Sequence, residues 1–170
     1  MASYRGHLIG GLVAAAGYTV VVTMLPVTQM AEYAHVLNGT EAIASVFVIA
    51  MLFSLFPDVD TKSKGQWIFY WAIFLLDALL IWTRHLEAAA YLGLIATLPL
   101  LGHHRGITHS KLAAFIVPLP IVIIPYLYNE KMLPISVVYY GAAVVGYLSH
   151  LLLDGLIVRW FRIRGRRFDQ

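Results

Sequence analysis

The stretch LPISVVYYGAAVVGYLSHLLLDGLIV, residues 133–158, decides the fold class of this chain. A helix needs about 20 apolar residues to cross the hydrocarbon core of a bilayer, and this stretch is long enough. Two ionisable residues, His150 and Asp154, interrupt it near its carboxyl-terminal end. Because charged groups are costly inside a membrane, such residues usually face the interior of a helical bundle. The stretch therefore predicts a transmembrane helix that carries polar chemistry.

Five further apolar runs extend this prediction to the whole chain. Of the 170 residues, 60% are hydrophobic and 12% are charged, whereas a soluble domain has about 25% charged residues. We therefore expect one all-α domain over residues 1–170, a polytopic transmembrane bundle of about six spans. The fourth run is the weakest, since about 14 residues form a helix of only about 21 Å. The five runs cover residues 8–27, 41–56, 67–82, 88–101 and 112–128.

Lysine and arginine residues are unevenly divided between the two predicted faces. With six spans, the face opposite the termini holds only Arg84 and Lys131. Positive residues accumulate in cytoplasmic loops, so the bias places both termini in the cytoplasm. The other ten of the 12 basic residues lie on the face of the termini: Arg5, Lys62, Lys64, Arg105, Lys111, Arg159, Arg162, Arg164, Arg166 and Arg167.

Side chains that bind metals gather on the same predicted face. They come from four segments that are far apart in the sequence, at the ends of different spans. Cysteine is absent, which excludes a thiol nucleophile and a thiolate zinc site and leaves histidine and carboxylate ligands. The segments supply His7; Asp58 and Asp60; His104, Arg105 and His109; and His150 with Asp154.

His150 and Asp154 are the pair that most strongly indicates a metal site. Their i, i+4 spacing places them on one face of the helix. Counted from Arg159, they lie about 13 Å and about 7 Å deep. A divalent cation would stabilise the carboxylate and the neutral imidazole together. Alternatively, the histidine is a hydrogen-bonded packing residue and the aspartate pairs with Arg159 or Arg162.

The other two clusters also have alternative readings. In Pro57-Asp58-Val59-Asp60, a single turn presents two carboxylates, although proline and aspartate also simply end helices. In the loop of residues 102–110, Arg105 can clamp a phosphate bidentately. It can equally be a topogenic positive residue, with Ser110 capping the next helix.

Taken together, these motifs resemble the YdjM-like family. The resemblance rests on His7 and on PDVD (57–60), HRGITHS (104–110) and GYLSHLLLD (146–154), and covers almost the whole chain. That family comprises bacterial and archaeal multi-pass proteins described as membrane-bound metal-dependent hydrolases, also called LexA-binding inner-membrane-associated hydrolases. A more distant similarity links the His150–Asp154 pair to zinc-dependent phospholipase C. That family's middle His-x-x-x-Asp pair is missing here, because His104 and His109 are five residues apart.

We therefore expect a metal-dependent hydrolase of the prokaryotic cytoplasmic membrane, acting on a phosphoester or phosphodiester of a lipid-like substrate at the cytoplasmic face. One or two divalent ions, zinc or manganese, suit a His/Asp ligand set. Asp60 or His104 would serve as general base, and Arg105 would hold the negative oxygens. The expected partners are the lipid bilayer and a phospholipid substrate, with no specific nucleic acid. The expected metal ligands are His7, Asp58, His109, His150 and Asp154.

Two other functions fit parts of the sequence. A metal transporter or channel would also place histidine and aspartate within the membrane, but it predicts polar residues along the whole bilayer depth. A metal-binding scaffold or adaptor would use the basic segment of residues 159–168 to bind anionic lipid or a partner. Asp77 interrupts the third run, and we expect a structural role for it, either beside His150 or paired with Arg84.

Overall fold

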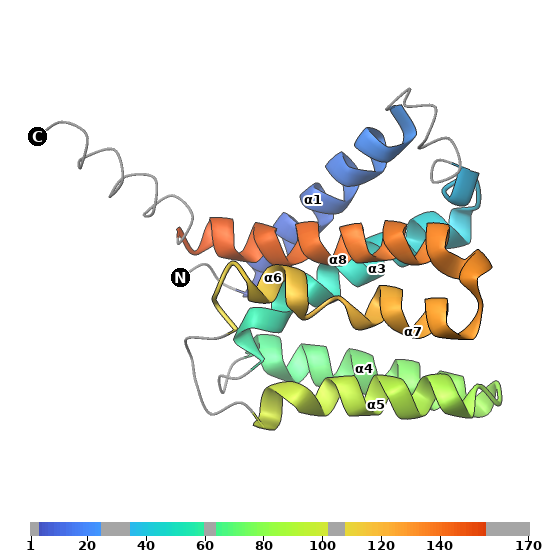
Figure 1. Ribbon diagram of the computed structural model, residues 1–170. Coiled ribbons are helices and arrows are strands. Elements are labelled where there is room, and N and C mark those ends of the chain that lie inside the picture. Colours follow the sequence, from blue (N-terminus) through green and yellow to red (C-terminus); the bar gives the residue numbers. More distant parts are fainter. Residues whose placement is uncertain (1–3, 25–34, 60–63, 102–107, 156–170) are drawn as a thin grey trace, which may run out of the picture.

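The computed structural model describes residues 4–24, 35–59, 64–101 and 108–155, without the side chains of residues 95 and 98–101. Every regular element in these ranges is helical, which confirms the all-α prediction (Figure 1). In chain order the elements are α1 (Tyr4–Met24), α3 (Thr40–Leu55), η1 (Phe56–Asp58), α4 (Lys64–Trp82), α5 (Leu86–Leu101), α6 (Ala113–Ile116), α7 (Pro120–Tyr128), η2 (Glu130–Met132) and α8 (Leu133–Leu153).

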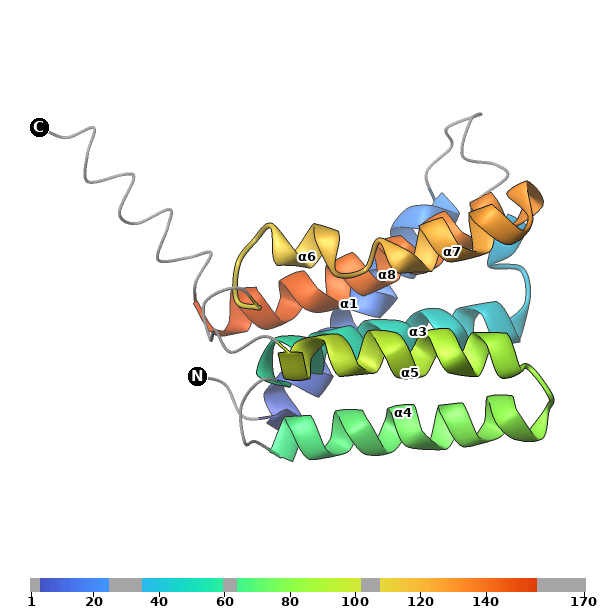
Figure 2. The ribbon, with the colours of Figure 1, turned by 60° about the horizontal axis from the view of Figure 1, so that its bottom comes forward.

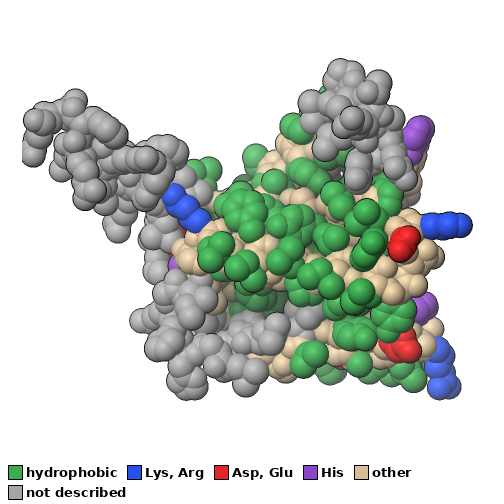
Figure 3. Space-filling model, viewed as in Figure 1, with side chains coloured by type: hydrophobic (Ala, Val, Ile, Leu, Met, Phe, Trp, Pro, Cys, Tyr) green, Lys and Arg blue, Asp and Glu red, His purple; other side chains and the backbone are tan. Residues whose placement is uncertain are grey.

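Four of the described helical segments are long and apolar enough to cross a membrane. They are α1, α3 continued by η1, α4, and η2 continued by α8. At 1.5 Å per residue, the 21 residues of α1 or α8 span about 31 Å, close to the thickness of a bilayer core. The remaining apolar helices, α5 and the α6–α7 segment, are shorter. On the face shown in Figure 3, hydrophobic side chains cover the flank of the bundle, and the charged side chains that are visible lie near its ends.

Helices α1, α3 and α8 form the tightly packed centre of the fold. Small residues allow this approach, as is common between membrane helices. A Cβ atom at Gly146 of α8 would lie 2.2 Å from the carbonyl oxygen of Ala50 in α3. A Cβ atom at Gly11 of α1 would lie 2.7 Å from Oγ of Ser54. The contact between these helices therefore depends on glycine at two positions.

The other helices flank this centre. Helices α4 and α5 form an antiparallel hairpin, and the hydroxyl of Tyr70 donates a hydrogen bond to the carbonyl of Ala96 at 3.3 Å (Figure 2). Helix α7 runs beside α8. At the far end of the bundle, the hydroxyl of Tyr128 donates to Glu87 at 2.8 Å and joins α7 to α5.

Two sequence predictions about helix boundaries are wrong. The run of residues 112–128 is not one helix but two, because Pro118 and Pro120 lie at the break and proline has no N–H to donate. The helix predicted over residues 133–158 ends at Leu153. Asp154 is its C-cap, and Gly155 follows with φ +73°, a left-handed conformation that ends helices and favours glycine. The ends of α1, α3 and α8 that carry the predicted site meet at one end of the bundle.

Candidate metal centre

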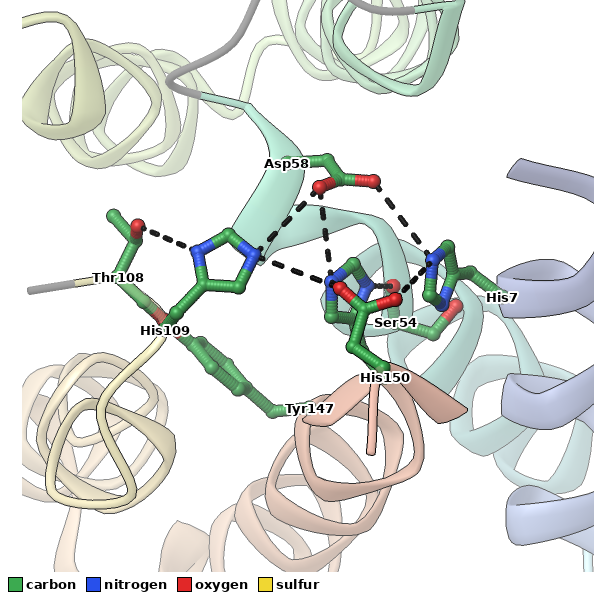
Figure 4. A network of polar contacts seen from close by, with 8 residues as sticks. His7, Ser54, Asp58, Thr108, His109, Tyr147 and His150 are labelled. Carbon is green, nitrogen blue, oxygen red and sulfur yellow. Dashed lines mark hydrogen bonds and ion pairs between the residues drawn. The ribbon is translucent and has the colours of Figure 1, made fainter. Parts of the chain in front are cut away.

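Five side chains from four segments converge at this end of the bundle. Figure 4 shows Asp58 facing three imidazole rings. The Nε2 atoms of His7, His109 and His150 lie 3.9, 3.8 and 3.7 Å from carboxylate oxygens of Asp58. The same three atoms lie 3.6, 3.9 and 3.5 Å from the carboxylate oxygens of Asp154. The structure thus brings together all five residues predicted as metal ligands.

The end of α3 positions Asp58. The helix tightens into the 3₁₀ turn η1, with Pro57 in its first turn, and Phe56 and Pro57 are buried. The amide of Gln66 in α4 donates to the carbonyl of Val59 at 2.8 Å. The proline and this hydrogen bond fix the turn and direct Asp58 toward the bundle interior.

A main-chain carbonyl orients His150. Its Nδ1 lies 2.7 Å from the carbonyl oxygen of Ser54. Because a carbonyl oxygen can only accept, Nδ1 must carry a proton, and in the neutral ring Nε2 is then the atom with the lone pair. That lone pair is directed at the two carboxylates. A hydrogen bond of this kind is the usual way in which proteins set a metal-binding histidine.

His109 is held through its neighbours in the segment before α6. The hydroxyl of Tyr147 in α8 donates to the carbonyl of Thr108. Oγ1 of Thr108 lies 3.3 Å from Nδ1 of His109. On the other side, Oγ of Ser110 accepts at 3.0 Å from the main-chain N–H of Ala113, the first residue of α6, although the N-cap of this helix is Leu112. The segment is therefore anchored on both sides of the imidazole.

The positions of these side chains suit a shared bound cation better than hydrogen bonds between the side chains. His7 and His150 are 1% and 0% exposed, and the side chain of Asp154 is 4% exposed. The Nε2 atoms of all three histidines are buried without a hydrogen-bond partner among the described residues. Their distances to the carboxylates exceed the usual limit of about 3.2 Å for an N–H···O bond. Buried polar atoms of this kind are rare unless something binds them. The nearly buried carboxylate of Asp154 and the partly buried carboxylate of Asp58, which is 17% exposed, also need compensating positive charge.

Three predicted catalytic residues, Asp60, His104 and Arg105, lie outside the described residues. Asp77 does not orient His150, since Nδ1 of that ring bonds to Ser54 instead. Among the described residues Asp77 has no ion pair with Arg84, and its buried Oδ1 has no hydrogen-bond partner.

Sequence reasoning missed two contributors to the site. Ser54 acts through its main-chain carbonyl, which has no signature in the sequence. Tyr147 acts through its hydroxyl, which holds the carbonyl of Thr108 beside His109. Its i, i+3 spacing from His150 places both on one side of α8, and this spacing is a signal that could have identified it.

Comparison with known proteins gives one match. The family model described as YdjM inner membrane protein matches residues 1–163. No curated protein and no solved structure matches the chain. The family match covers every residue of the cluster, and the more distant resemblance to zinc-dependent phospholipase C gains no support from these comparisons.

Proposed function

The chain belongs to the YdjM inner membrane protein family, and we propose that it is a membrane-embedded, metal-dependent hydrolase of phosphoesters or phosphodiesters. The observation that carries this proposal is the convergence of three buried imidazole Nε2 atoms on two carboxylates, within 3.5 to 3.9 Å. Groups of histidine and aspartate with this separation can hold a metal ion.

The residues of the site would have separate roles in metal binding, proton transfer and substrate binding. His7, Asp58, His109, His150 and Asp154 would hold zinc or manganese. When bound, the metal supplies an acidified water as nucleophile and polarises the phosphoryl oxygen. Burial of the ligands keeps competing water away from the imidazole lone pairs. Two residues outside the described ranges would complete the site, Asp60 or His104 as general base and Arg105 as the clamp on the phosphoryl oxygens.

We further propose six membrane crossings with both termini and the metal centre on the cytoplasmic side. The ends of α1 and α8 near the centre lie at the same end of the bundle (Figure 1). The shorter segments, α5 and α6–α7, run alongside spanning helices and would cross beside them. Of the described lysines and arginines, the opposite end carries only Arg84 and Lys131, together with the acidic Glu87 and Glu130.

A lipid-like substrate is supported by a groove on α4, the helix whose Gln66 bonds to the turn that carries Asp58. A pocket of about 380 Å³ lies along α4, with lining residues on successive turns of the helix: Gln66, Trp67, Tyr70, Trp71 and Phe74. Gln66 at its near end bonds to Val59, the residue after Asp58. The pocket is lined mainly by aromatic side chains, and Trp67 and Phe74 are 65% and 60% exposed to the surroundings. An acyl chain could lie along α4 while the phosphoester reaches the centre.

The packing of α1, α3 and α8 argues against the alternative function as a metal transporter. Beyond the centre, the space between α1, α3 and α8 is filled by buried apolar side chains, among them Ala15, Val46, Ala50, Val138 and Ala142. Beyond the centre these described helices bury few polar groups, among them Ser136 and the hydroxyl of Tyr18, and these offer no charged side chain to a passing ion. A polar site at one end of the bundle, with apolar packing between it and the other end, suits catalysis at one membrane face.

The test is hydrolysis by purified protein in lipid vesicles. A set of phosphomonoester and phosphodiester lipids would be assayed after chelation and after addition of zinc or manganese. We expect turnover only with metal, and its loss in Asp58→Asn. Asp77→Asn is the matched control, because it removes a carboxylate that is outside the centre, and it should remain active. A metal-loaded protein that hydrolyses none of these esters would instead favour the scaffold.

A further inference from the structure

We propose that the centre holds two metal ions rather than one, with His7 on the first ion, His109 and His150 on the second, and both aspartates bridging them. This inference rests on the proposed function and deepens it, because it assigns each ligand to an ion. It follows from the orientation of the imidazole rings and from the division of the contacts between carboxylate oxygens.

The nitrogens of His7 and His150 are near enough to one another for one ion, but the orientation of the two rings favours separate ions. Their centroids are 3.8 Å apart and their planes differ by 16°, so the rings are stacked face to face. The lone pair of an imidazole nitrogen lies in the plane of its ring, so a bound ion lies close to that plane. Two nearly parallel planes that are a van der Waals distance apart do not meet within the ~2.0–2.1 Å of a metal–imidazole bond. Each ring therefore directs its lone pair at a different position.

The separation of those positions matches a known type of site. Stacked rings whose centroids are 3.8 Å apart place two ions at about the same spacing. Paired catalytic ions in phosphatases and nucleases lie about 3.5–4 Å apart.

The rings of His109 and His150, unlike the stacked rings of His7 and His150, are oriented so that they can bind the same ion. Their ring centroids are 5.5 Å apart and their planes differ by 69°. Planes at so steep an angle intersect close to the rings, so one ion can lie in both. Each of the two Nε2 atoms also lies within 3.9 Å of the same oxygen of Asp58, Oδ1, and the same oxygen of Asp154, Oδ2.

The carboxylate contacts divide in the same way. Nε2 of His7 pairs with Oδ2 of Asp58 and Oδ1 of Asp154, whereas the other two histidines pair with Oδ1 of Asp58 and Oδ2 of Asp154. Each aspartate thus turns one oxygen toward His7 and the other toward the His109–His150 pair. This is the arrangement of a carboxylate that bridges two ions. The ion on His7 would have three protein ligands and the other ion four, so the His7 side has more room for substrate.

Metal titration followed by electron paramagnetic resonance tests this assignment. Apoprotein in detergent would be titrated with Mn²⁺, and bound metal would be counted after removal of free ion. We expect two ions per wild-type chain and a spin-coupled signal, because bridging carboxylates couple the ions. His7→Ala should bind one ion and give an uncoupled six-line signal. His85→Ala, an exposed histidine at the far end of the bundle, should behave like wild type.

The outcomes separate the two proposals. One ion per wild-type chain, or two ions without spin coupling, would overturn the bridged pair but leave a metal centre in place. Loss of both ions in a folded His7→Ala would overturn the assignment of His7 to its own ion. Absence of any bound Mn²⁺ or Zn²⁺ in the wild type would refute the proposed function as well. The wild-type count and signal decide the question even if His7→Ala does not fold.

Discussion

The imidazole of His150 is held by a hydrogen bond from its Nδ1 to the main-chain carbonyl of Ser54, at 2.7 Å. The bond joins α8 to the last turn of α3, one turn before Asp58. It fixes the tautomer of His150 and at the same time the register between the two helices that supply three of the five cluster residues. The geometry of the centre is therefore tied to the packing of α3 against α8.

This coupling makes Gly146 a critical packing position. A methyl group there would lie 2.2 Å from the carbonyl oxygen and 2.8 Å from Cα of Ala50, and neither main-chain atom can move aside alone. We expect Gly146→Ala to cost about 1–3 kcal/mol or more of stability and to reduce bound metal. Thermal unfolding in detergent and metal analysis would measure both effects.

Gly17→Ala in α1 is the matched control, because a Cβ atom there meets nothing within 4 Å. Alanine is the better helix former, so this variant should be as stable as wild type or more so, by up to about 1 kcal/mol. Equal stability of the two variants would show that the close contact of α3 and α8 is not required.

Tyr147 positions the segment that carries His109, by donating to the carbonyl of Thr108. Tyr147→Phe should leave the fold intact and weaken metal binding by about tenfold, the lower end of the effect of residues that orient metal ligands. Competition with a metal indicator would measure the affinity. Tyr140→Phe is the control, since Tyr140 in the same helix donates to the carbonyl of Phe115, away from the centre. An equal loss in both variants would contradict the positioning role.

The orientation in the membrane can be tested directly because the chain contains no cysteine. Single cysteines would replace Lys111, at the end with the candidate metal centre, and Lys131, at the opposite end. In intact cells, a thiol reagent that does not cross the inner membrane should label Lys131→Cys, and Lys111→Cys should react only after the membrane is opened. The reverse pattern would place the metal centre outside the cytoplasm.

The groove on α4 predicts a dependence on the length of the lipid chain. Trp71 lines the groove, so Trp71→Ala should raise KM for a long-chain phosphoester by about threefold to tenfold, as expected for partial loss of an apolar contact. It should have little effect on a short, soluble phosphoester. Leu79→Ala, which alters an exposed residue of the same helix outside the groove, is the control. Equal KM values for Trp71→Ala and wild type on the long-chain substrate would show that the lipid chain binds outside this groove.

Much of this arrangement could be predicted from the sequence, for identifiable reasons. Apolar runs report helices in a membrane directly, because the backbone must satisfy its own hydrogen bonds there. The five cluster residues could be grouped because each lies at or near an end of a predicted span, and the alternating direction of the spans brings those ends to one membrane face: His7, Asp58, His109, His150 and Asp154.

Other features could not be predicted, because they depend on three-dimensional packing. The break between α6 and α7 is an exception, because Pro118 and Pro120 are visible in the sequence and neither has an N–H to donate. The sequence cannot show that a carbonyl at Ser54 meets His150, or that two rings stack. Both relationships depend on how closely α1, α3 and α8 approach, and that distance is set by glycine contacts between helices.

The most direct test of the central claim is the metal content of the protein purified in mild detergent without chelator, measured by mass spectrometry. Wild type and Asp77→Asn should carry zinc or manganese in near-stoichiometric or higher amounts. A folded His150→Ala/Asp154→Ala variant should carry almost none. Wild-type protein without bound metal, which also takes up none on reconstitution, would contradict the account.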